Sequence, residues 1–119
     1  MELYKVYCYE KCSTCKKALK FLDSNNIKYE LIDIKGNNPN EEVLKEVKAK
    51  ANTSFNKMFN TSGLLYREYE LSKKLPNMTD DEMLKLLASN GMLVKRPILI
   101  GDDFALLGFK EDKWEEKTL

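Results

Sequence analysis

The spacing of apolar and polar residues predicts a strand, a helix and a second strand at the start of the chain. Residues 2–9 are rich in Tyr and Val, lack Gly and Pro, and are apolar on both faces, which indicates a central strand. Apolar side chains follow at helical spacing over 13–25, and alternation over 27–34 predicts the next strand. Together these elements form a βαβ unit, whose strands we expect to be parallel with a right-handed crossover.

The middle of the chain has the pattern of a helical block. A break rich in Gly, Asn and Pro precedes a narrow apolar stripe over roughly 40–51, where we expect Asn38 or Asn40 to cap the helix. One or two shorter helical pieces are expected around 54–59 and 66–71, with a turn at Ser62-Gly63.

A further helix of about 80–90 is predicted by a capping box. In this motif the Thr79 hydroxyl and the Glu82 carboxylate each bind a backbone N–H at the start of the helix. We expect Gly91 to be the C-terminal stop of this helix.

The C-terminal part of the chain predicts a β-hairpin followed by a short helix. Apolar runs at 98–100 and 104–107 flank a Gly-Asp-Asp turn, and residues 111–117 allow a last helical turn or two with Trp114 packing back. The element order is therefore βαβ, helical block, ββ, α. This order indicates an α/β fold with a mixed sheet flanked by helices.

Composition and charge narrow the classes of function. The chain has 119 residues, of which 43% are hydrophobic and 33% charged, so we expect a single domain over 1–119 with a helical insertion at about 40–90. The net charge of +1 argues against direct DNA binding and against attraction to an anionic membrane. No apolar run approaches the ~20 residues of a membrane span, and the N-terminus does not resemble a signal peptide, so we expect a cytosolic protein.

Cys12 and Cys15 form a C-x-x-C motif between the first predicted strand and the first predicted helix. A zinc clip, an inert buried pair and a redox pair all use this spacing. Zinc needs four ligands, but the chain contains no His and only one other cysteine, Cys8. A helix-start pair beside Lys is not typical of a core, whereas C-x-x-C within a βαβ pattern is the thioredoxin-like redox signal. A redox pair is therefore favoured, and Cys8 is interpreted as a small core residue.

The predicted position of the pair suggests a role for each thiol. At the start of a helix, the Cys12 sulfur would face unpaired N–H groups and the positive end of the helix dipole, with Lys11 beside it. Such settings stabilise a thiolate. Cys15 comes one helical turn later, so its sulfur can approach that of Cys12. We therefore expect Cys12 to be the nucleophile and Cys15 the thiol that resolves a mixed disulfide.

Arg96 and Pro97 stand immediately before the predicted hairpin. Most X–Pro bonds are trans, but thioredoxin-like folds place a cis proline opposite the cysteine pair and just before their third strand, which is where Pro97 lies. Arg96 would then direct a permanent cation into the same cleft, to bind an oxyanion or to hold a thiolate charged. The alternative is that Arg96 is a solvated surface residue.

These landmarks together resemble the Spx/arsenate-reductase (ArsC) family, a thioredoxin-fold group with a helical insertion. The resemblance rests on "CSTC", "FNTSGLLYREYEL", "LLASNGMLVKRPILI" and "LGFKEDKWEE". In detail the chain is most similar to the small Spx-like, arsenate-reductase-related proteins of Gram-positive bacteria. The resemblance implies that Cys12 is the reactive cysteine and that glutathione with glutaredoxin, or thioredoxin, supplies electrons. No bound cofactor is implied. The expected catalytic residues are Cys12 and Cys15, and the expected substrate-binding residues are Arg96, Pro97, Lys11 and Thr14, with no metal ligand.

The resemblance also implies where two family functions diverge. Arsenate reductases of the glutaredoxin-dependent type bind the oxyanion with several arginines, and Arg96 matches one of them. Two others align near Asn60 and Gly108, where this chain has no basic residue. Arg67 or Lys57 are the candidates to replace them. Spx-type regulators keep C-x-x-C as a redox switch and bind the C-terminal domain of the RNA polymerase α subunit. The resemblance therefore implies a thiol–disulfide oxidoreductase, or alternatively a redox-sensing regulator with RNA polymerase as its partner.

Overall fold

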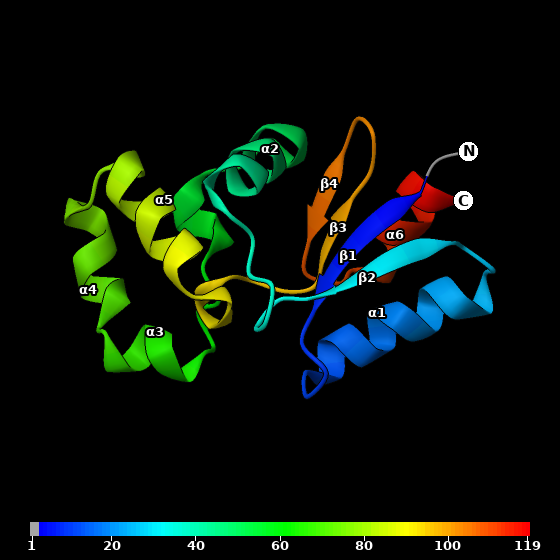
Figure 1. Cartoon of the computed structure of the whole chain (residues 1–119), viewed down its shortest axis with the longest axis horizontal. Coiled ribbons are helices and arrows are strands. Elements are labelled where there is room, and N and C mark those ends of the chain that lie inside the picture. The colour runs from blue at the N-terminus through cyan, green and yellow to red at the C-terminus, as the bar shows by residue number, and fades with distance from the viewer. Residues whose placement is uncertain (1–2) are drawn as a thin grey trace.

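The computed structural model describes residues 3–119 and has a four-stranded mixed sheet at its centre (Figure 1). The strands are β1 (Tyr4–Cys8), β2 (Tyr29–Asp33), β3 (Ile98–Ile100) and β4 (Ala105–Leu107), in the order β2-β1-β3-β4. β1 pairs in parallel with β2 and antiparallel with β3, and β3 pairs antiparallel with β4. The predicted βαβ unit, the C-terminal hairpin and the interior position of the first strand are confirmed.

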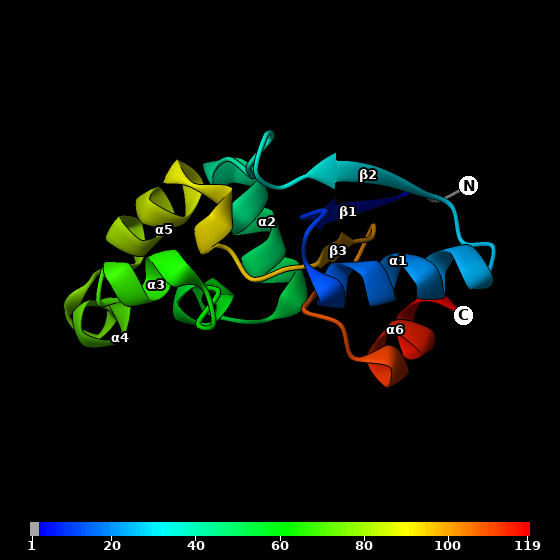
Figure 2. The same ribbon diagram turned by 90° about the horizontal axis from the view of Figure 1, so that it is seen from below.

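Helices cover both faces of the sheet and extend beyond one end of it. The helical elements are α1 (Ser13–Ser24), α2 (Glu41–Ala51), η1 (Phe55–Met58), α3 (Leu64–Glu68), α4 (Leu71–Lys74), η2 (Leu75–Asn77), α5 (Asp80–Ser89), η3 (Gly91–Leu93) and α6 (Glu111–Thr118). Figure 2 shows α1 and α6 on the same side of the sheet, while α3, α4 and α5 gather far from the two termini. The result is an elongated molecule of 42 × 27 × 25 Å.

The alternation of side chains along the strands creates two separate cores. Val6, Cys8 and Leu99 point to one face, where they pack with α1 and with Trp114 of α6. Tyr7 and Ile98 point to the other face, where they join a cluster that includes α2 and α5. Because the strand period is two, the residues at the end of β1 divide between these cores, and Cys8 falls on the α1 side.

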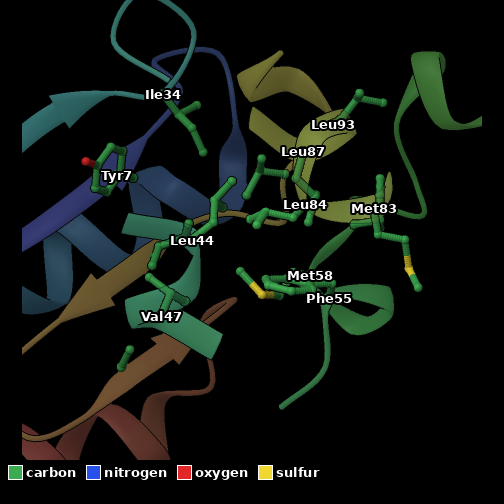
Figure 3. Close-up of a cluster of buried hydrophobic side chains, with 14 of the residues drawn as sticks. Tyr7, Ile34, Leu44, Val47, Phe55, Met58, Met83, Leu84, Leu87 and Leu93 are labelled. Carbon is green, nitrogen blue, oxygen red and sulfur yellow. The ribbon is translucent and has the colours of Figure 1, made fainter. Parts of the chain in front are cut away.

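The second core ties the helical block to the sheet. Leu44 and Val47 of α2 lie between the sheet residue Tyr7 and the α5 side chains, and all of these side chains are buried (Figure 3). Phe55 and Met58 of η1 belong to the same cluster and lie close together beneath the α5 side chains (Figure 3). The segment that follows η1 is therefore held against the sheet rather than left as a loose loop.

Most local signals behave as predicted. The Thr79 hydroxyl accepts a hydrogen bond from the Glu82 N–H at 3.2 Å, and the Glu82 carboxylate accepts one from the Thr79 N–H at 2.9 Å. Asn40 caps α2 by accepting a hydrogen bond from the Val43 N–H. Trp114 is fully buried, and its indole N–H donates to the Gly108 carbonyl at 3.1 Å.

Two predictions in the helical block are wrong in detail. The piece expected at 66–71 is instead two short helices, because Glu70 takes a left-handed backbone conformation (φ 51°) and separates α3 from α4. Gly91 is not a left-handed helix stop. It begins η3, and a Cβ at this position would overlap the Ile34 carbonyl oxygen, so glycine is required here by close packing.

Replacing Leu44 with Ala should lower the free energy of unfolding by about 2–5 kcal/mol, because it leaves a cavity where the helical block meets the sheet. Urea denaturation measures the change. Leu64→Ala is the matched control, since the Leu64 side chain is 66% exposed and should contribute less than about 0.5 kcal/mol. Equal losses in the two variants would contradict the proposed role of the α2 contact.

Candidate active site around Cys12 and Cys15

Cys12 lies at the junction of β1 and α1, at the position that caps the helix (Figure 1). The turn before it is closed by a hydrogen bond from the Cys12 N–H to the Tyr9 carbonyl at 3.0 Å. The Cys12 side chain makes no capping hydrogen bond and is half-buried. Its sulfur therefore lies at the positive end of the α1 dipole, as the sequence predicted.

Cys15 is at the third position of α1 and is only 1% exposed. Its sulfur accepts a hydrogen bond from the Tyr9 N–H at 3.5 Å and also hydrogen-bonds with the Cys8 and Cys12 thiols. These contacts lower the pKa of Cys15 to about 6, chiefly through the Cys8 hydrogen bond, and the Arg96 charge acts in the same direction. Burial opposes the shift but does not reverse it. The buried thiol of the motif is therefore set to carry negative charge.

Cys8 is buried, as predicted, but it is more than core filling. Its hydrogen bond with Cys15 and its burial both raise the pKa of Cys8, so it remains a thiol and donates to the Cys15 sulfur. Sequence reasoning missed this contact. The available signal was that Cys8 is the last residue of the strand that leads directly into the C-x-x-C turn.

The Arg96–Pro97 peptide bond is cis, as the family resemblance predicted. β1 and β3 pair with Tyr7 opposite Ile98, so continuing the register places Pro97 beside Cys8 and Arg96 beside Tyr9. The Arg96 guanidinium lies 5.3 Å from the centroid of the Tyr9 ring, in agreement with that register. Arg96 is thus packed into the site rather than dispersed in solvent.

Arg96 retains unused donor capacity. One terminal N–H of its guanidinium donates to the Met92 carbonyl at 3.4 Å, while its Nε is buried without a hydrogen-bond partner among the described residues. A buried, unpartnered cationic donor is costly. Because Arg96 also lines an open pocket, its guanidinium charge is suited to binding an anion there.

That pocket, here called the cationic pocket, has a volume of about 550 Å³. It contains four basic side chains and no acidic one. Its lining residues are Thr14, Lys57, Phe59, Asn60, Thr61, Ser62, Lys95, Arg96, Leu107, Gly108, Phe109 and Lys110. The concentration of positive charge, next to the first turn of α1, favours a negatively charged ligand.

Lysines stand beside the two positions where the resemblance expects arginines. These positions, Asn60 and Gly108, both line the pocket, and Lys57 lies there with them. A Cβ at Gly108 would lie 3.2 Å from the Lys95 Cε, so the Lys95 side chain occupies the space beside that glycine. Sequence reasoning missed Lys95 and Lys110, and it named Arg67, which is exposed and does not line this pocket.

A second pocket, here called the sulfur pocket, is lined by Cys8 and Cys15, whereas the cationic pocket touches the motif only through Thr14. The sulfur pocket has a volume of about 470 Å³ and is lined by Cys8, Tyr9, Glu10, Cys15, Lys16, Leu19, Leu31 and Asp33. It shares no lining residue with the cationic pocket. Lys11 lies in the exposed turn before Cys12 and lines neither pocket, so its role in substrate binding stays a prediction.

Residues 3–119 present neither a cluster of metal ligands nor a membrane-spanning helix. No group of three or more Cys, Asp or Glu side chains is arranged to hold a metal ion in that part of the chain. None of its helices has the length and apolar character needed to cross a membrane.

Residues 7–117 match the model of the ArsC family. The chain belongs to the ArsC family. YusI, an uncharacterised protein of Bacillus subtilis, is 46% identical over 110 residues, covering 92% of this chain and 93% of YusI. The solved structure of an ArsC-family-related protein from Bacteroides fragilis is also 46% identical, with a TM-score of 0.92 and 95% of each chain covered.

More distant ArsC-family relatives carry two different functional names. An arsenate reductase of Neisseria meningitidis is 28% identical, covering 87% of this chain and 88% of the relative. The global transcriptional regulator Spx 2 of Bacillus anthracis is 20% identical, covering 91% of this chain and 81% of the regulator. Both have the ArsC-type scaffold, so the scaffold alone does not separate a reductase from a regulator.

In a Cys12→Ser variant, the Cys15 thiolate should titrate near pH 6, well below the ordinary thiol value of 9.0. Adding Cys8→Ala should raise the pKa of Cys15, because it removes the Cys8 hydrogen bond that contributes most to lowering that pKa. Thiolate ultraviolet absorbance measures both.

The same shift predicts a change of stability with pH. Since the folded protein loses the Cys15 proton first, this ionisation raises the free energy of unfolding between about pH 6 and 9, and the gain is lost as the pH falls through about 6. Cys15→Ser should lack this component in urea denaturation. An unchanged pH profile would contradict the lowered pKa.

Proposed function

We propose that the protein is a cytosolic thiol–disulfide oxidoreductase that reduces anionic substrates through Cys12 and Cys15. The observation that carries this proposal is the site itself. A half-buried thiol at the α1 N-terminus hydrogen-bonds with a buried thiol of lowered pKa, next to Arg96 and a cluster of lysines. ArsC-family membership and the thioredoxin-like sheet support the same chemistry.

The reaction balances as two successive thiol–disulfide exchanges. The Cys12 thiolate attacks one sulfur of the substrate disulfide, forms a mixed disulfide and releases the other half as a thiol after protonation. The Cys15 thiolate then attacks the Cys12 sulfur, so the second half leaves and a Cys12–Cys15 disulfide remains. Two electrons pass to the substrate, and a thiol donor such as glutathione with glutaredoxin, or thioredoxin, returns them.

The cationic pocket indicates the class of substrate. Arginine forks bind tetrahedral oxyanions through two parallel hydrogen bonds, whereas lysines act as single point charges. With one arginine and three lysines, the pocket suits a carboxylate-bearing disulfide, such as one formed with an acidic peptide thiol, better than arsenate. Thr14, at the second position of α1, lines the same pocket and adds a hydroxyl close to the helix N-terminus.

The second candidate is a redox-sensing regulator, and the observation that favours it is the relationship to Spx-named proteins. A regulator would oxidise once and hold its disulfide, whereas an enzyme would turn over repeatedly. Many turnovers per molecule with excess thiol donor support the first proposal. A single turnover, together with capture of the RNA polymerase α C-terminal domain by one redox form, would support the second.

Cys12→Ser should lose all reduction of an anionic disulfide, whereas Cys15→Ser should stop at the mixed disulfide, because no second thiol resolves it. Intact-mass spectrometry after exposure to oxidised glutathione distinguishes these outcomes. The adduct mass is expected on Cys15→Ser and absent from Cys12→Ser. An adduct on Cys12→Ser of the same yield would show that Cys12 is not the nucleophile.

Lys57→Ala and Lys95→Ala should each raise the KM for an anionic disulfide by about two- to tenfold with little change in kcat, because each removes one solvent-exposed charge contact. The control is Lys45→Ala, since Lys45 is an exposed lysine of α2 outside the cationic pocket. A neutral disulfide substrate should not distinguish the variants. Equal effects on neutral and anionic substrates would refute charge selection by this pocket.

A further inference from the structure

Three cysteine sulfurs meet where β1 ends and α1 begins, but the reaction above uses only two of them. Cys15 is the central thiol, because it hydrogen-bonds with both Cys8 and Cys12. The hydrogen bond of the Cys8 thiol is made to Cys15 and not to Cys12. Cys8 precedes the β1–α1 turn and Cys15 follows it, and both residues line the sulfur pocket. A disulfide at Cys15 is therefore within reach of a second attacking thiol.

We propose that Cys8 is a third redox residue, which takes over the disulfide from Cys12 and leaves a Cys8–Cys15 bond in the sulfur pocket. This inference rests on the proposed function, because it begins from the Cys12–Cys15 disulfide formed in that reaction. It assigns redox chemistry to a strand residue that otherwise serves as a hydrogen-bond donor to Cys15.

The exchange balances without an external oxidant. Cys8 loses its proton, its sulfur bonds to the Cys15 sulfur, the Cys12–Cys15 bond breaks, and Cys12 leaves as a thiolate. One disulfide replaces another, so the oxidation state of the protein does not change. Two equivalents of a cellular thiol then reduce the Cys8–Cys15 bond and are themselves oxidised to a disulfide.

The surroundings of the three sulfurs favour this direction. Cys12 leaves at the N-terminus of α1, where its half-buried side chain remains accessible. Cys8 and Cys15 lie in the buried cluster with Val6, Ala18 and Leu22, and a neutral disulfide suits that apolar setting better than a charged thiolate does.

The separation of the two pockets provides a functional reason for moving the disulfide from Cys12 to Cys8. The cationic pocket receives the anionic substrate, and it shares no lining residue with the sulfur pocket, where Cys8 and Cys15 are found. Moving the disulfide to Cys8–Cys15 thus presents it to the thiol donor through a different opening. The nucleophile Cys12 becomes a free thiolate again before the donor arrives.

Tryptic peptide mapping tests the relay, because cleavage after Lys11 separates Cys8 from the other two cysteines. The peptide 6–11 contains Cys8, and the peptide 12–16 contains both Cys12 and Cys15. After one equivalent of oxidised glutathione, samples are acid-quenched, alkylated and digested at successive times. A disulfide inside 12–16 should form first, followed by a linked pair of peptides with an alkylated Cys12.

The rate of the second step is a further readout. Burial raises the pKa of Cys8 and keeps it protonated, so the appearance of linked peptides should accelerate by about tenfold per pH unit below the Cys8 pKa. Cys8→Ala should still form the 12–16 disulfide, though more slowly at neutral pH because the pKa of Cys15 rises. Formation of that disulfide also shows that the variant folds, and its Cys12 should never alkylate afterwards. Cys15→Ser should give no linked peptides.

The possible outcomes separate a failure of the relay from a failure of the proposed function. A 12–16 disulfide that persists without linked peptides overturns the relay and leaves the proposed function standing. No intramolecular disulfide at all overturns both. Linked peptides in Cys15→Ser would show a Cys8–Cys12 bond and overturn the assignment of Cys15 as the central thiol.

Discussion

The hydrogen bonds to the Cys15 sulfur are the interaction on which the site depends. They hold the first turn of α1 against the end of β1, because the donors are the Tyr9 N–H and the Cys8 thiol, both at the end of that strand. The same contacts lower the pKa of Cys15 and leave Cys12 at the exposed end of the helix. One junction therefore sets both the position and the charge of the two thiols.

The rest of the fold supplies charge and shape around that junction. The pairing of β1 with β3 places Arg96 against Tyr9, from where its charge acts on Cys15. The contact of α2 and η1 with the far face of the sheet positions Lys57, while the ends of the hairpin carry Lys95 and Lys110. The cationic pocket is thus assembled from segments on both sides of the helical insertion.

Local signals in the sequence were sufficient for the elements and for the C-x-x-C position, because caps, turns and strand alternation act over a few residues. The Thr79 capping box and the buried Trp114 are examples. The cis bond before Pro97 followed only from the family resemblance, since base rates favour trans. Of the lysine cluster only Lys57 was named from the sequence, because the members are separated along the chain and are brought together only by the fold. The Cys8–Cys15 contact was missed because a buried strand cysteine has no local signature that distinguishes it from core.

The most direct measurement of the central claim is a count of free thiols before and after a single turnover. The reduced protein has three free cysteines. If Cys12 and Cys15 act as a two-electron pair, denaturing thiol titration after reduction of one equivalent of an anionic disulfide should find one free thiol and no retained adduct. Two free thiols with a bound adduct would show that Cys12 works alone, and three would show that the site does not carry out the reaction.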